Sequence, residues 1–202
     1  MGKKKSAEPA QSKAENFVNH QRRKYANEWD ASSESLAGQA VYEWMAEQLG
    51  TTGFVLEIGA GTGRSTLELL KRGNKVISVE ENPNCLSRTR RAIEAAGYKV
   101  VSVPRGTIRP IDSSYHAISY REIKQLKSED WDVPLIEGNV IRDEHLVKFL
   151  KAVGQFDAVV CWLIEGTGQC GSTGRLILKA WMIRRNTGYS FKTPSMSWRT
   201  SS

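Results

Sequence analysis

The pattern of apolar and polar positions predicts helices and strands that alternate along the middle of the chain. Apolar residues recur three or four positions apart over residues 33–49, the spacing that buries one face of a helix. Ser32 or Ser33 is a suitable N-cap for this segment, and Gly50 is a suitable end. We therefore expect one amphipathic helix here, packed against the core.

Short β-prone runs follow this helix, and polar or glycine-containing stretches separate them. Strands are expected at residues 54–58, 75–79, 133–136 and 156–162, with another over residues 100–103. Helices are expected from Gly63 to about Gly73, from Asn82 to Gly97 and over residues 143–153. This alternation is typical of an α/β fold, and it predicts a doubly wound, mainly parallel sheet with helices on both faces.

The two ends of the chain differ in composition from the middle. Residues 1–16 contain almost nothing apolar, so we expect a disordered basic tail before a domain at residues 17–165. Residues 166–202 hold no acid and too few apolar runs to complete the sheet, so its C-terminal strands are expected to be incomplete. We interpret this segment as the product of a truncated or frameshifted reading frame, which predicts exposed apolar surface; a genuine basic substrate-binding tail is the alternative.

The net charge of +7 changes little in this picture once it is located along the chain. Six of the 29 Lys and Arg residues follow Glu165, which leaves 23 bases against 22 acids before that point. Nucleic acid is therefore only weakly supported as a partner. No apolar run approaches the roughly 18 residues of a membrane span, and the three cysteines match no disulfide framework. We expect a cytoplasmic protein that has no membrane partner.

A glycine-rich run comes directly after the first expected strand, and it is the clearest candidate for chemistry. Its five residues are Gly59, Ala60, Gly61, Thr62 and Gly63. Glycines let the backbone approach a ligand, and the start of the next helix offers free N–H groups. Glu80 and Glu81 end the following strand, where a carboxylate can accept both hydroxyls of a ribose. The sequence therefore predicts a nucleoside site.

The spacing of the glycines distinguishes between two kinds of cofactor. A dinucleotide fingerprint is Gly-x-Gly-x-x-Gly, but Arg64 stands where its third glycine belongs. The run from Val55 through Glu57 to Gly63 resembles the first motif of the class I S-adenosylmethionine-dependent methyltransferases. This resemblance implies a Rossmann-like fold, S-adenosyl-L-methionine as the cofactor and methyl transfer to an unidentified acceptor. An NAD-dependent oxidoreductase and an inactive or truncated binding module are the alternative functions.

The resemblance also implies roles for single residues. Glu57 looks like the acid that places the methionine end of the cofactor, and Glu80 is similar to the acid that binds the ribose. Asn139 and Val140 resemble the segment that lines the adenine, although many members have Asp in place of Asn139. The expected cofactor-binding residues are Glu57, Gly59, Ala60, Gly61, Thr62, Gly63, Glu80, Glu81, Asn139 and Val140.

Each polar member of this set has a structural alternative. Glu57 is otherwise an exposed acid at a strand end, Glu80 and Glu81 are acids favoured at a helix N-terminus, and Asn139 is a turn residue. No catalytic residue and no metal ligands are identified. The fourth expected strand lacks the Asn/Asp-Pro-Pro-Tyr motif of enzymes that methylate nucleobase or glutamine amides. His116 and the tyrosines beside it, in the irregular segment 98–132, are interpreted as surface residues rather than as an acceptor pocket.

Overall fold

The computed structural model describes residues 13–111, 116–124, 126, 131–162 and 181–184, and these residues form one central sheet and a small hairpin. The order of the sheet is β3-β6-β2-β1-β7-β8. All neighbouring strands run parallel, except that β8 is antiparallel to β7. The strands are β1 (Phe54–Ile58), β2 (Lys75–Glu80), β3 (Val100–Val103), β6 (Val133–Glu137), β7 (Ala158–Cys161) and β8 (Trp181–Arg184). The predicted α/β fold with a mainly parallel sheet is confirmed.

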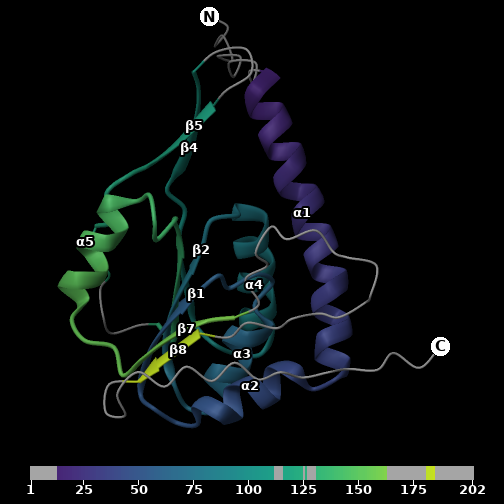
Figure 1. Cartoon of the computed structure of the whole chain (residues 1–202), viewed down its shortest axis with the longest axis vertical. Helices are drawn as coiled ribbons and strands as arrows, with labels where there is room; N and C mark the ends of the chain where they lie inside the picture. The colour runs from purple at the N-terminus through teal and green to yellow at the C-terminus, as the bar shows by residue number, and fades with distance from the viewer. Residues whose placement is uncertain (1–12, 112–115, 125, 127–130, 163–180, 185–202) are drawn as a thin grey trace, which may run out of the picture.

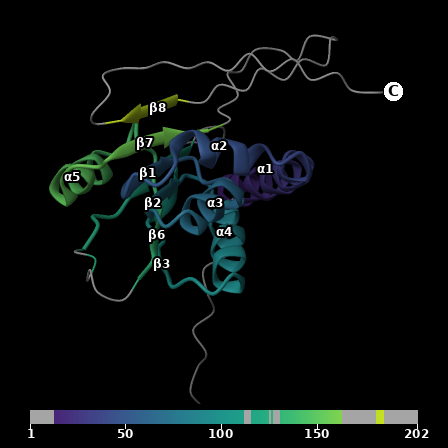
Figure 2. The same cartoon turned by 90° about the horizontal axis from the view of Figure 1, so that it is seen from below.

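Helices cover both faces of the sheet, as Figure 2 shows. Of the described helices, four lie on one face and one lies on the other. The larger group is α1 (Lys13–Gly38), α2 (Val41–Leu49), α3 (Arg64–Lys71) and α4 (Pro83–Ala95), and the opposite helix is α5 (Glu144–Val153). Helix α1 is long and runs from the hairpin down to α2 (Figure 1).

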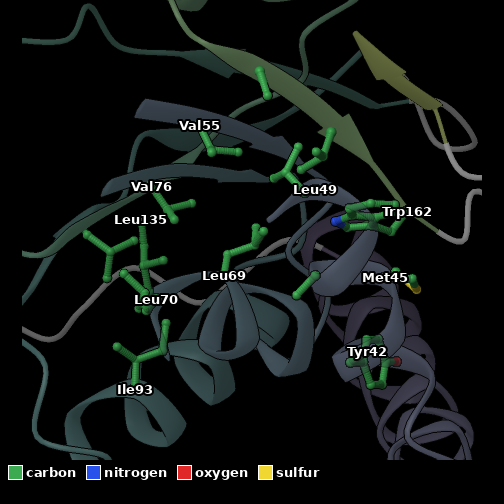
Figure 3. Packing of buried hydrophobic residues seen from close by; sticks show 14 of the residues in the cluster. Tyr42, Met45, Leu49, Val55, Leu69, Leu70, Val76, Ile93, Leu135 and Trp162 are labelled. Carbon is green, nitrogen blue, oxygen red and sulfur yellow. The ribbon is translucent and has the colours of Figure 1, made fainter. Parts of the chain in front are cut away.

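Alternating side chains of the strands divide the core into two clusters. Val55 and Val76 point toward α2, α3 and α4 and join the first cluster (Figure 3). Their neighbours Leu56 and Ile77 point to the other face and join the second cluster beneath α5. This is the period of two expected for a strand that is buried on both faces.

Two predicted helix starts are confirmed by their capping hydrogen bonds. The side chain of Asn82 accepts from the backbone N–H of Asn84 at 3.0 Å, and Pro83 occupies the first turn of α4. The carboxylate of Asp143 accepts from the N–H of Leu146 at 3.0 Å and caps α5 in the same way.

The single helix predicted over residues 33–49 is wrong. Helix α1 continues to Gly38, and α2 begins at Val41 after Ala40, which adopts a left-handed conformation with φ 54°. Ser33 therefore lies within α1, where its hydroxyl donates to the carbonyl of Asp30. Most of α1 is polar, so the apolar period did not reveal it. The helix starts inside the tail predicted for residues 1–16, so residues 13–16 are helical.

The irregular segment 98–132 contains β3 and an antiparallel hairpin of β4 (Gly106–Pro110) and β5 (His116–Tyr120). A buried ion pair holds this hairpin against the sheet. Arg105 contacts the Asp143 carboxylate at 2.7 Å and donates to the carbonyl of Arg121 at 2.7 Å. The Glu137 carboxylate accepts the N–H groups of Arg105 and Gly106 at 2.7 and 2.8 Å. The hairpin is therefore anchored at the end of β6 and the start of α5.

Residues 1–12 of the predicted tail, and all of the predicted C-terminal segment 166–202 except β8, lie outside the described residues. Strand β8 overlaps the end of an apolar run in that segment. Within the described ranges, no helix has the length and apolar character needed to cross a membrane.

Candidate functional site

The glycine loop connects β1 to α3 and is attached to the end of β2 by its own N–H groups. Gly59 and Ala60 both donate to the carbonyl of Val79, at 2.8 and 3.2 Å. The N–H of Gly61 donates to Glu80 Oε2 at 2.9 Å. These bonds turn the loop toward β2, which is its parallel neighbour in the sheet.

Two of the glycines are required because other parts of the protein come very close. A Cβ on Gly63 would lie 2.8 Å from the backbone Cα of Thr89 in α4, so glycine lets α3 and α4 approach each other. A Cβ on Gly61 would collide with the indole nitrogen of Trp29 in α1. The hydroxyl of Thr89 donates to the carbonyl of Gly61 at 3.0 Å and fixes the same point of the loop.

Glu80 lies at the centre of the site because each of its carboxylate oxygens accepts a backbone N–H. Oε2 accepts from Gly61, and Oε1 accepts from Asn82 at 2.8 Å. Burial raises the pKa of Glu80, and the bonds from Asn82 and Gly61 oppose this rise. A carboxylate offers about four lone pairs, so it can still accept a further donor such as a ribose hydroxyl. The predicted ribose contact is compatible with this acceptor chemistry, and it stays a prediction.

Glu57 is completely buried, so its interpretation as an exposed strand-end acid is wrong. Its carboxylate accepts hydrogen bonds from the hydroxyls of Ser65 and Thr66 in α3 and of Ser78 in β2. Removal from water raises the pKa of Glu57, while these three hydroxyls lower it in part. The carboxylate therefore joins β1, β2 and α3 beneath the loop, and its predicted contact with a methionine group stays a prediction.

Glu81 and Asn139 lie together at the end of the site toward β6. Asn139 Nδ2 donates to Glu81 Oε2 at 2.8 Å, and the Tyr120 hydroxyl donates to Glu81 Oε1 at 3.3 Å. Asn139 Oδ1 accepts the N–H groups of Ile141 and Arg142, which is the pattern of a turn residue. Both carbonyl lone pairs of Asn139 are thereby used, so Glu81 supplies the remaining acceptor atoms at this position.

Other residues that the sequence analysis named lie at or near the same end of the site. Val140 is half-buried against the second cluster, next to the predicted adenine position. In the hairpin, Tyr120 contacts the site by its hydrogen bond to Glu81, while His116 is exposed at the far end. Tyr115 lies outside the described residues.

Helix α1 covers the glycine loop and the turn after β2, and the sequence did not predict this. The hydroxyls of Ser33 and Thr62 hydrogen-bond at 2.9 Å. Asn82 Nδ2 donates to the carbonyl of Arg22 at 2.9 Å, and Arg88 in α4 forms a 3.0 Å ion pair with Asp30. The aromatic residues within this polar segment, Phe17, Tyr25 and Trp29, gave a signal in the sequence but did not say what they contact.

A small pocket opens beside the loop, between α1, α2 and the end of β7. Its lining includes Tyr42 from α2 and Trp162, which follows β7. Trp162 is 6% exposed and packs in the first cluster with Met45 (Figure 3). Its indole Nε1 is buried and has no hydrogen-bond partner within the described structure. Both aromatic residues were missed as site residues because isolated aromatics usually indicate core packing.

Comparisons with known proteins give a local match to a methyltransferase. No family model matches the chain. The chain is 36% identical over 67 residues to a protein-L-isoaspartate O-methyltransferase 1 of Syntrophobacter fumaroxidans (strain DSM 10017 / MPOB), over 32% of this chain and 31% of that protein. The chain thus spans about a third of the length of the curated relative that it matches.

A dimethyladenosine transferase from Plasmodium falciparum is similar in structure with a TM-score of 0.34 and 17% sequence identity, over 62% of this chain and 40% of that one. The sequence match to the bacterial protein supports a distant relationship between this chain and the methyltransferases.

Proposed function

We propose that the protein binds S-adenosyl-L-methionine at the glycine loop and transfers its methyl group to an acceptor. The hydrogen bond between Glu80 and Gly61 carries this proposal. It joins the two predicted cofactor elements at the carboxyl ends of β1 and β2, which is where ligands bind in open α/β sheets. The local match to a methyltransferase supports the same assignment.

The direction of the loop N–H groups favours this cofactor over a dinucleotide. A pyrophosphate binds to free N–H groups of the glycine loop and the following helix. Here the N–H groups of Gly59, Ala60 and Gly61 donate to β2 and Glu80, and that of Gly63 donates to the carbonyl of Ala60. The loop is therefore a tight turn with few free donors, and it suits a nucleoside without a diphosphate.

Different residues at this edge would bind different parts of the cofactor. Glu80 would accept the ribose hydroxyls, while Glu81, Asn139 and Val140 would surround the adenine. Bound S-adenosylmethionine supplies a methyl group on a sulfonium, which is already electrophilic. The protein then needs to hold this group in line with the acceptor and to exclude water, which is catalysis by proximity and orientation.

Calorimetry with S-adenosylmethionine and S-adenosylhomocysteine tests the proposal on the full chain. Wild type should bind both ligands, and Glu80→Ala should bind them about 10-fold to 100-fold more weakly, because hydrogen bonds to a charged group are lost. Glu94→Ala is the matched control, since Glu94 is an acid in an exposed ion pair with Arg90 on α4. Absence of heat with wild type, or equal affinities of Glu80→Ala and wild type, would contradict the cofactor site.

Two further measurements separate the alternative functions. A radiolabelled methyl donor, incubated with pools of protein, nucleic acid and small-molecule acceptors, distinguishes an enzyme from a module that binds without turnover. Titration with NADH, followed by its fluorescence, would instead favour an oxidoreductase if it saturated.

A further inference from the structure

A second hollow lies on the face of the sheet that α5 covers (Figure 2). It is a groove of about 730 Å³ between α5 and the chain that leads from β5 to β6, and Ile77 of β2 is part of its lining. Binding sites for small molecules have volumes of about 300–1,000 Å³. The groove therefore has room for a small organic molecule, whereas the pocket beside the glycine loop measures only about 10 Å³.

One wall of the groove is a single face of α5. His145, Lys148 and Ala152 line it at spacings of three and four residues, and Phe149 and Val153 lie on the same face. From His145 to Val153 the helix rises by roughly 12 Å. Along this length the lining changes from polar to apolar residues, which suits a ligand with one polar end.

Aromatic rings supply much of the apolar lining. Phe54 at the start of β1, Phe149 of α5 and Trp131 before β6 all line the groove. Aromatic rings gain energy from offset or edge-to-face contacts beyond the area that they bury. A flat aromatic body therefore fits the chemistry of this lining.

The charges at the groove favour an anion. Lys75 and Lys148 line it and are exposed, and neither forms an ion pair within the described part of the chain. Of the described residues that line the groove, Glu122 alone is acidic. An ammonium group on a flexible four-carbon stem can reach a carboxylate at the mouth of the groove. An aromatic molecule that carries a carboxylate thus matches both the rings and the cations.

The groove extends to the amino ends of β1 and β2, whereas the nucleoside site lies at their carboxyl ends. Lys75 begins β2 and Glu80 ends it. A strand rises about 3.3 Å per residue, so the backbones of these two residues are roughly 16 Å apart. None of the residues predicted to bind the cofactor lines the groove. The two sites are therefore separate.

We propose that this groove is a second binding site, for an aromatic carboxylate. The rings of the ligand contact Phe54, Phe149 and Trp131, and its charge pairs with Lys75 and Lys148. The proposal does not depend on methyl transfer, because the groove shares no residue with the nucleoside site.

Fluorescence titration of the full chain with pyrenebutyrate and with the uncharged pyrenebutanol tests the aromatic body and the charge together. Wild type should bind both probes, and at low ionic strength it should bind the carboxylate about 5-fold more tightly. High salt should reduce this difference, because salt screens exposed charges. S-adenosylhomocysteine should displace neither probe, whether or not the chain binds it.

Substitution of the two lysines tests the source of the selectivity. Lys75→Gln and Lys148→Gln change exposed side chains, so both variants should fold as wild type does. Each should weaken the binding of pyrenebutyrate about 2-fold to 5-fold and leave that of pyrenebutanol unchanged. Lys151→Gln is the matched control, because Lys151 is exposed on α5 outside the groove and should leave both affinities unchanged.

Ala152→Trp tests the place of binding. Ala152 is exposed and lines the groove, so an indole at this position occupies the space of the ligand. The variant should bind both probes at least about 10-fold more weakly. Lys151→Trp adds the same ring at the neighbouring position outside the groove, and it should bind both probes as wild type does.

Four results would overturn the inference. Equal affinity of wild type for the two probes at low salt would show that the lysines select no anion. Equal binding by Ala152→Trp and wild type would place the probes elsewhere, and displacement by S-adenosylhomocysteine would place them in the nucleoside site. Failure of wild type to bind either probe would refute the second site. If wild type then formed a dimer that Ala152→Trp disrupts, the groove would be assigned to a second copy of the chain.

Discussion

At the scale of single residues, Glu57 joins three elements of the fold through one carboxylate. Its carboxylate accepts three hydroxyls from α3 and β2, and the side chain has no exposure to solvent. The sequence identified Glu57 as an important acid because it precedes the glycine loop. It did not reveal the hydroxyl partners, since Ser65 and Thr66 meet Glu57 only when α3 packs on the sheet, and Ser78 meets it only when β2 pairs with β1.

Replacement of Glu57 by Gln should change how stability depends on pH. Burial raises the pKa of Glu57 above its unfolded value of 4.5, so the folded state holds the proton more tightly. The resulting stabilisation is fully present below that value and is lost as the pH rises through the folded pKa. In Glu57→Gln this loss is absent, so the free energy of unfolding should fall less steeply above pH 4.5 than in wild type.

Urea unfolding at several pH values between 4.5 and 8 measures this slope. Glu94→Gln is the control, because it removes an exposed carboxylate, and it should keep the slope of wild type. Identical slopes in Glu57→Gln and wild type would show that Glu57 does not titrate differently on folding.

At the scale of elements, helix α1 is the part of the site that the sequence left out. Its polar composition gives no apolar period, so its position depends on contacts with α2, α4, β4 and the loops. The segment that contains the hairpin of β4 and β5 was likewise predicted only as irregular structure. Its hairpin is held by Arg105, which pairs with Asp143 from a segment 38 positions away in the sequence. A local pattern in the sequence does not reveal contacts between residues that lie so far apart along the chain.

The docking of α1 predicts that Gly61 and Trp29 are energetically coupled. Gly61→Ala introduces a Cβ at φ 56° and also collides with the Trp29 indole. The left-handed conformation alone costs alanine about 1–2 kcal/mol, and the collision adds to it. Trp29→Ala removes the collision, so the double variant should be more stable than the sum of the two single effects predicts, by about 1 kcal/mol or more.

Gly59→Ala is a matched control for this cycle. Gly59 also has a positive φ, of 81°, but a Cβ there meets nothing within 4 Å. Its effect should therefore add to that of Trp29→Ala in chemical denaturation. Additivity at Gly61 as well would mean that α1 does not lie on the loop in solution.

At the scale of the whole molecule, the two faces of the sheet are covered unequally. In the part of the chain that the structure describes, the second cluster is covered mainly by α5. A groove of about 730 Å³ remains on this side, with Phe54, Ile77 and Phe149 in its lining. Apolar surface of this kind favours association and dye binding.

The purified chain should therefore bind an apolar fluorescent dye in its native state and self-associate on size exclusion. Ile141→Ser should leave the dye signal unchanged, because Ile141 is 88% exposed and lies outside the groove. A monomer that melts cooperatively and binds no dye would contradict this prediction.

The amino-acid sequence by itself determined the α/β class, most of the parallel strands and the position of the glycine loop. These features depend on local chemistry: apolar period, capping residues and the backbone freedom of glycine act over a few neighbouring positions. Asn82 illustrates this, since its cap was predicted and is present.

Only the tertiary structure decided what surrounds the loop. Trp29 from α1, Tyr42 from α2 and Trp162 after β7 meet at the pocket although more than a hundred positions separate the first two from the last. Their meeting depends on the strand order and on helix packing, which single-sequence pattern does not encode. For the same physical reason Glu57, an acid predicted at a ligand site, is fully buried beneath α3.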